Sequence, residues 1–133
     1  MHIPDPYHWF SPPARKRLLI GCFVISALCL WAMTMLDESL TTDAAPSGIL
    51  SFEFAGSMPR ARQILASWNA ERKIMAGLSL GIDYLFLVAY ALFISNACAC
   101  LARALVKRRF LLANAGFLLA WAQFPAALLD AIE

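Results

Sequence analysis

The sequence predicts an all-α fold: an integral membrane helical bundle of three transmembrane helices, with an amphipathic helix outside the membrane. The 133 residues are 61% hydrophobic and only 15% charged, whereas soluble domains are nearer half apolar and a quarter charged. A domain of this length also has too little interior to hide so much apolar surface from water. Finally, almost all of the charged residues lie outside three long apolar stretches.

Each apolar stretch is long enough to cross about 30 Å of hydrocarbon, which takes roughly 20 helical residues. Residues 18–36 and 110–129 contain no charge, and residues 74–102 contain only Asp83. A cleaved signal peptide is the competing interpretation of the first stretch. That stretch is too long for a typical signal core, however, and no convincing small-residue cleavage site follows it. We therefore predict a retained membrane anchor.

The basic residues predict the orientation, because short loops rich in Lys and Arg stay on the cytoplasmic side. Seven of the eleven basic residues border one side of the three stretches. They are Arg15, Lys16, Arg17, Arg103, Lys107, Arg108 and Arg109. Within this single membrane domain, residues 1–17 and 103–109 are thus predicted to be cytoplasmic, and residues 37–73 and 130–133 extracytoplasmic. The predicted location is the bacterial inner membrane.

The segments outside the spans carry local signals. Residues 1–13 contain four prolines and three aromatic residues, which favours an interfacial anchor, with a partner-docking peptide as the alternative. Alternating apolar and polar residues over 48–56 predict a short extended or interfacial piece. Ser57 is the predicted N-cap of an amphipathic helix over about 58–73. No strong breaker separates that helix from the second span, so a single long bent helix is an alternative.

Asp83 is the most informative polar residue. It lies nine residues into the second span, where an ionised carboxylate costs about 2.5–3.5 kcal/mol. Tyr90 shares its helix face, and Gln123 is expected at a similar depth, so an Asp83–Gln123 hydrogen bond is geometrically available. These three residues form a candidate intramembrane site, which either holds helices together or binds a proton or cation. In the second case, the outer acidic pair Asp130 and Glu133 would join it.

Small and amide side chains predict how the helices pack. Gly77 and Gly81 form a G-x-x-x-G pattern, and Gly116 and Ala120 repeat the same spacing, which permits close helix approach. Asn96 and Asn114 lie at matched depths in the second and third spans. We predict that this pair forms a structural contact between the two helices.

Catalytic and metal-binding signals are weak. The cysteines, Cys22, Cys29, Cys98 and Cys100, form no C-x-x-C motif. Both histidines lie outside the spans, which argues against a bis-histidine haem within the bundle. No phosphate loop, nucleophile elbow or zinc-protease motif occurs. We therefore predict no metal, no cofactor and no enzymatic activity. The net charge of +2 also argues against binding to nucleic acid.

Several strings resemble an uncharacterised family of small bacterial multi-pass integral membrane proteins with three to four helices. They are LTTDAAPSGILSFEFAGS (40–57), ILASW (64–68), LGIDYLFLVAYAL (80–92) and LLDAIE (128–133). The resemblance covers most of the chain beyond the first span and implies a helical membrane fold without an assigned activity. It also implies a fourth helix after residue 133, so the chain is expected to be a truncated form.

The function predicted from these features is that of a non-enzymatic accessory or assembly subunit of a larger membrane complex, such as a respiratory or photosynthetic one. Its predicted partners are the lipid bilayer, other membrane subunits and further copies of itself. The alternative is a small oligomeric transporter or proton-coupled channel that uses Asp83, Tyr90 and Gln123. A membrane enzyme ranks third.

Overall fold

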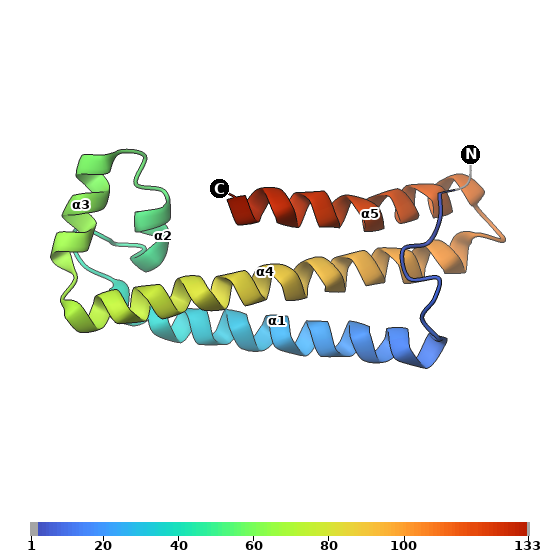
Figure 1. Cartoon of the computed structure of the whole chain (residues 1–133), viewed down its shortest axis with the longest axis horizontal. Coiled ribbons are helices and arrows are strands. Elements are labelled where there is room, and N and C mark those ends of the chain that lie inside the picture. The colour runs from blue at the N-terminus through green and yellow to red at the C-terminus, as the bar shows by residue number, and fades with distance from the viewer. Residues whose placement is uncertain (1–2, 133) are drawn as a thin grey trace. The chain divides into compact units, whose positions relative to one another are not determined.

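A computed structural model describes residues 3–132, which fold into five α-helices (Figure 1). The helices are α1 (Pro12–Leu40), α2 (Gly48–Glu53), α3 (Met58–Ser67), α4 (Ala70–Leu105) and α5 (Phe110–Ile132). The described residues contain no strand, only one isolated bridge between Thr42 and Ala45. The all-α prediction is therefore confirmed.

Three of these helices, α1, α4 and α5, are long and apolar enough to cross a membrane. They contain the predicted spans 18–36, 74–102 and 110–129, and α1 and α4 extend beyond them into charged flanking residues. In α1 the helix begins at Pro12, because proline is compatible with the first helical turn, where its missing N–H is not needed. The basic triplet at 15–17 is therefore helical.

The chain forms two compact units. The first, which we call the terminal unit, comprises residues 1–27 and 86–133, of which 3–27 and 86–132 are described. The second, which we call the central unit, comprises residues 28–85. Both α1 and α4 contribute residues to each unit.

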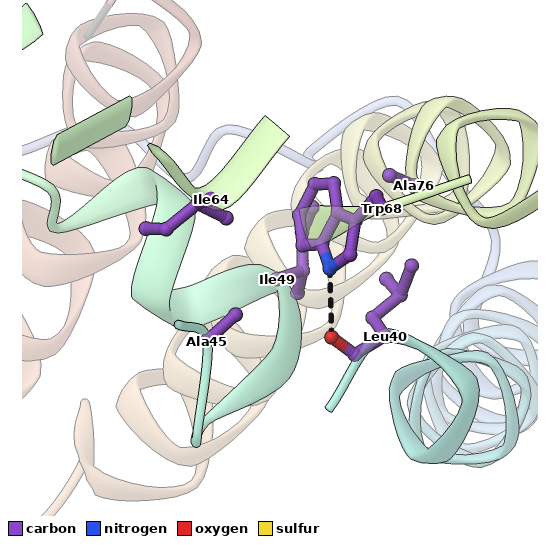
Figure 2. Close-up of a cluster of buried hydrophobic side chains, with 6 residues drawn as sticks. All are labelled: Leu40, Ala45, Ile49, Ile64, Trp68 and Ala76. Carbon is purple, nitrogen blue, oxygen red and sulfur yellow. Dashed lines mark hydrogen bonds between the residues drawn. The ribbon is translucent and has the colours of Figure 1, made fainter. Parts of the chain in front are cut away.

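The central unit has a core of bulky apolar side chains (Figure 2). Its buried members are Leu40, Ala45, Ile49, Ile64, Trp68 and Ala76. The Trp68 indole Nε1 donates a hydrogen bond of 2.8 Å to the Leu40 carbonyl oxygen. This bond ties the end of α1 to the segment after α3, and it satisfies a polar group inside the core.

Residues 48–53 form helix α2, where the sequence predicts an extended or interfacial piece. The helix forms here because of a tertiary contact with α1. The Asp37 Oδ1 atom, at the end of α1, accepts a hydrogen bond of 2.7 Å from the Ile49 amide and thereby satisfies a free amide at the start of α2. Gly48 has a φ of +52° and lies against the Asp37 carboxylate, a conformation and a closeness that favour glycine.

Helices α3 and α4 are separate, so the long bent helix over 58–102 does not form. Ser57 caps α3, as predicted, by accepting a hydrogen bond of 3.4 Å from the Arg60 amide. Trp68 is extended, with φ −94° and ψ 128°, and its side chain is held in the core. Asn69 Oδ1 then accepts a hydrogen bond of 2.9 Å from the Arg72 amide and so caps the start of α4.

The terminal unit is packed through smaller side chains. Tyr7, Ala99, Ala102, Phe117 and Ala120 form its buried cluster. At Gly116 an added Cβ would lie 2.9 Å from the Ala102 Cβ, so α4 and α5 approach closely at this glycine. Small residues permit such an approach between helices.

Candidate functional site

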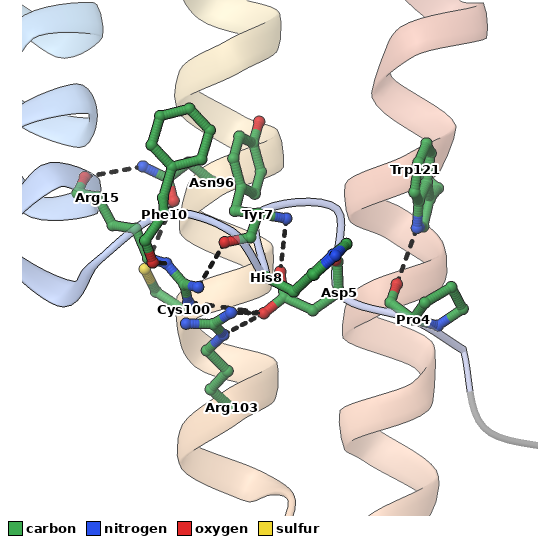
Figure 3. Close-up of polar contacts among 10 residues, drawn as sticks. All are labelled: Pro4, Asp5, Tyr7, His8, Phe10, Arg15, Asn96, Cys100, Arg103 and Trp121. Atoms are coloured by element: carbon green, nitrogen blue, oxygen red, sulfur yellow. Dashed lines mark hydrogen bonds and ion pairs between the residues drawn. The ribbon is translucent and has the colours of Figure 1, made fainter.

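The N-terminal segment is built into the terminal unit through Tyr7 (Figure 3). Tyr7 is only 5% exposed and packs among alanines and Phe117. Trp9, in contrast, remains 68% exposed. The segment is thus partly a packed element of the fold, whereas the sequence predicts an interfacial anchor for all three of its aromatic residues.

Asp5 links this segment to two helices. Its carboxylate forms ion pairs with Arg103 of α4 and with Arg15 of α1, the latter at 3.6 Å between Oδ2 and Nη1. Its Oδ1 accepts a hydrogen bond of 2.8 Å from the Tyr7 amide, a local turn that Asp commonly stabilises. One carboxylate therefore orients the segment and faces two guanidinium groups.

Arg15 is the buried centre of this network, with 6% exposure. Its Nε donates to the Phe10 carbonyl oxygen at 2.9 Å, and its Nη2 donates to the Tyr7 carbonyl oxygen. The Arg15 backbone carbonyl accepts a hydrogen bond of 3.0 Å from Asn96 Nδ2. Its Nη1 is buried without a hydrogen-bond partner among the described residues.

Further hydrogen bonds fasten the segment to α5. Trp121 Nε1 donates to the Pro4 carbonyl oxygen at 2.8 Å, and Asn114 Oδ1 accepts from the Ile3 amide at 3.4 Å. The two asparagines predicted to contact one another thus bind the N-terminal half of the chain: Asn96 contacts Arg15 and Asn114 contacts Ile3. The sequence predicted matched depths for the two asparagines, but it did not predict these partners.

Burial raises the pKa of the Tyr7 phenol, although the neighbouring Ser95 side chain lowers it in part. Ser95 itself is buried and donates to the Ala120 carbonyl oxygen at 2.7 Å. The Tyr7 phenol therefore stays neutral at physiological pH and serves as a packing group.

The structure brings together two residues of the predicted site, Tyr90 and Asp130. The Tyr90 hydroxyl donates a hydrogen bond of 2.8 Å to Asp130 Oδ2, linking α4 to α5. Gln123 belongs to the same terminal unit, whereas Asp83 belongs to the central unit. Glu133, the other member of the predicted acidic pair, lies outside the described residues.

Within the central unit, Glu53 has two carboxylates, those of Asp83 and Asp37, near enough to influence its charge. Partial burial raises the pKa of Glu53, and the negative charges of Asp83 and Asp37 raise it further. Only the formation of α2 brings Glu53 to this position, and the sequence predicted no helix there. One helical turn before Asp83, the Ser79 hydroxyl is buried without a hydrogen-bond partner among the described residues.

No group of His, Cys, Asp and Glu residues suited to holding a metal ion occurs within residues 3–132. The described cysteines are free thiols. The carboxylates of Asp37 and Asp83 lie near enough to Glu53 for their negative charges to raise its pKa.

The two predicted small-residue patterns have different surroundings. Gly116 and Ala120 are used within the terminal unit, where Ala120 is fully buried and Gly116 faces Ala102. At Gly77 and Gly81, an added Cβ would find no other part of the described chain within 4 Å. The Gly77–Gly81 surface of α4 is therefore open.

No protein family model, curated protein or solved structure matches this chain.

Proposed function

We propose that the protein is a non-enzymatic accessory or assembly subunit that acts through helix packing in a larger complex of the bacterial inner membrane. The observation that carries this proposal is the open surface at Gly77 and Gly81 of α4. In lipid, small residues let two helix backbones approach, and van der Waals contact then stabilises the pair. Gly116 and Ala120 pack within the terminal unit, whereas Gly77 and Gly81 are open to contact with a second helix.

The amount of uncovered apolar surface supports the same proposal. In the most apolar 18-residue windows of α1, α4 and α5, only 11%, 33% and 11% of the residues are buried. These helices therefore offer broad surfaces to lipid or to other membrane helices.

The polar groups of the terminal unit also favour a packing role. Ser95 and Asn96 are fully buried and hydrogen-bonded to backbone carbonyls, and Tyr90 is bonded to Asp130. Polar side chains engaged in this way hold helices together and are not free to line a path for a solute.

The basic residues support a cytoplasmic N-terminus. The triplet 15–17 begins α1, and the connection between α4 and α5 carries Lys107, Arg108 and Arg109. The rule that such residues stay inside places both segments in the cytoplasm.

The decisive experiment is affinity purification from native membranes in mild detergent, followed by mass spectrometry. We expect the wild-type chain to recover other membrane proteins in a fixed ratio and the double variant G77L/G81L to lose them. Gly21→Leu is the matched control, because Gly21 also lies in a helix with open space around its Cα. Recovery of the chain alone, or equal recovery by G77L/G81L, would contradict the proposal.

One observation favours a second candidate, a small oligomeric transporter or proton-coupled channel. The grouping of Asp37, Glu53 and Asp83 raises the Glu53 pKa, and perturbed carboxylates are common at proton-transfer sites. In liposomes with an internal pH-sensitive dye, this function predicts a proton flux that Asp83→Asn abolishes and Asp43→Asn, at an exposed site, preserves. The absence of flux from the wild-type protein would exclude this candidate.

A further inference from the structure

A basic pocket of about 300 Å³ lies in the terminal unit. It is lined by Pro12, Arg15, Lys16 and Leu19 of α1 and by Cys100 and Arg103 of α4. We propose that this pocket binds the phosphate group of an anionic phospholipid. The proposal is independent of the subunit function, because it depends on neither Gly77 nor Gly81.

The charges around the pocket favour an anion. One carboxylate, Asp5, contacts both Arg15 and Arg103, while no ion pair of Lys16 occurs among the described residues. Three cations therefore share a single anion, and positive charge remains uncompensated. The buried Arg15 Nη1 makes no hydrogen bond among the described residues, and its acidic partner, Asp5 Oδ2, lies 3.6 Å away. Burying a cation with incomplete partners is costly, so a bound anion would stabilise this arrangement.

The donors in the pocket suit a phosphate group. Lysine and arginine both donate charge-assisted hydrogen bonds to phosphate oxygens. The start of α1 adds little from its backbone, because Pro12 and Pro13 have no amide hydrogen to donate. Recognition would therefore depend mainly on the side chain of Lys16, because Nε and Nη2 of Arg103 already contact Asp5, while Arg15 and Arg103 add positive charge.

The apolar part of the pocket favours a phospholipid over free phosphate. Leu19 lines the pocket, and one helical turn further along α1 Phe23 is 57% exposed. A phosphate group near Lys16 would thus have an apolar helix surface next to it, which suits an acyl chain. Basic pockets between helices at the membrane surface recognise lipid headgroups through this combination of charge and apolar contact.

Cys100 provides a direct readout, because it lines the pocket and is partly exposed. The purified full-length chain would be treated with an alkylating reagent in detergent, and modification of residue 100 followed by peptide mass spectrometry. We expect phosphatidylglycerol to slow the modification with saturation, and phosphatidylcholine to have a much weaker effect. Inorganic phosphate should not protect at the same concentration.

Lys16→Gln tests the site without disturbing the Asp5 network. We expect it to weaken phosphatidylglycerol protection about fivefold, the typical contribution of one basic residue near anionic lipid. Arg17→Gln is the matched control, because Arg17 is adjacent, exposed and outside the pocket lining, and it should leave the protection unchanged.

Three outcomes would overturn the proposal. Equal protection by phosphatidylglycerol and phosphatidylcholine would show that the phosphate charge is not recognised. Protection by inorganic phosphate at the same concentration would identify free phosphate as the ligand. Equal effects of Lys16→Gln and Arg17→Gln would show that general basic charge, and not this pocket, attracts the lipid.

Discussion

The two units of the chain are stabilised in different ways. The central unit buries Leu40, Ile49, Ile64 and Trp68 in a core like that of a small soluble domain. In the terminal unit, the buried cluster is mostly alanine, and polar contacts of Asp5, Arg15 and Asn96 join segments that are distant in the sequence.

We expect residues 40–68 to face water and the long apolar helices to face lipid, and this would account for the difference. Most of the central core comes from residues 40–68, which include the end of α1 and the region between the candidate spanning helices. In water, burial of each large apolar side chain contributes about 1.5–3 kcal/mol. Between helices in lipid that contribution is absent, so close packing of small residues and hydrogen bonds hold the helices together.

The largest expected effect comes from Asp5→Asn, which would break the polar network of the terminal unit. It leaves the buried Arg15 without a counter-charge, a change that typically costs about 3–5 kcal/mol. Thermal unfolding in detergent should show the loss, and hydrogen exchange should increase over residues 3–27 and not over 40–68. An unchanged melting temperature, equal to that of the exposed-site control Asp43→Asn, would mean that the network is not stabilising.

Gly48→Ala tests the central unit through its backbone. An alanine there must adopt φ +52° and collide with the Asp37 carboxylate, so we expect a loss of about 2–3 kcal/mol. Gly56→Ala is the matched control, since Gly56 has φ +65° but an added Cβ would meet only the Phe54 carbonyl oxygen, at 4.0 Å, and about 1 kcal/mol should be lost. Equal losses of unfolding free energy would show that Asp37 does not constrain the start of α2.

Gly116→Ala tests the close packing of α4 against α5 in the terminal unit. The added methyl group meets Ala102, and overpacking of this kind costs about 1–2 kcal/mol. Gly81→Ala, in open space on α4, should instead stabilise the chain by about 0.5–1 kcal/mol through helix propensity. Thermal melting of both variants measures the contrast, and shifts in the same direction would contradict it.

The smallest effect is expected from Glu53→Gln in the central unit. Because the folded-state pKa of Glu53 is raised by burial, Asp83 and Asp37, the folded chain binds more protons than the unfolded chain above about pH 4.3. The contribution of Glu53 to the free energy of unfolding is therefore lost as the pH rises through the raised pKa.

Glu53→Gln should thus be more stable than wild type at pH 7, by less than about 1 kcal/mol because the side chain is largely exposed. The difference should vanish below about pH 4, where both side chains are neutral. Unfolding measured across this pH range tests the expectation. In an Asp83→Asn background the gain should shrink, and a gain that is independent of both pH and Asp83 would contradict it.

The site could be predicted from the sequence only in part. Helical spacing identified Asp83, Tyr90 and Asp130 as candidate polar residues, but it did not predict the Tyr90–Asp130 hydrogen bond. The position of Glu53 near Asp83 requires α2, and at the start of α2 the Ile49 amide donates a hydrogen bond to Asp37, twelve residues away. Local pattern alone indicated an extended piece.

Composition and local spacing are sufficient to predict the three long apolar helices and the Ser57 cap. These features depend on composition, length and neighbouring residues, which act over one or a few helical turns. Tertiary contacts, in contrast, set the end of α3 at Ser67, the burial of Tyr7 and the contact of Asp5 with Arg103, 98 residues away. Such contacts form only when the helices and the N-terminal segment pack together. Polar groups that this packing removes from water require hydrogen-bond partners within the protein, and a local sequence pattern does not identify partners that are distant in the sequence.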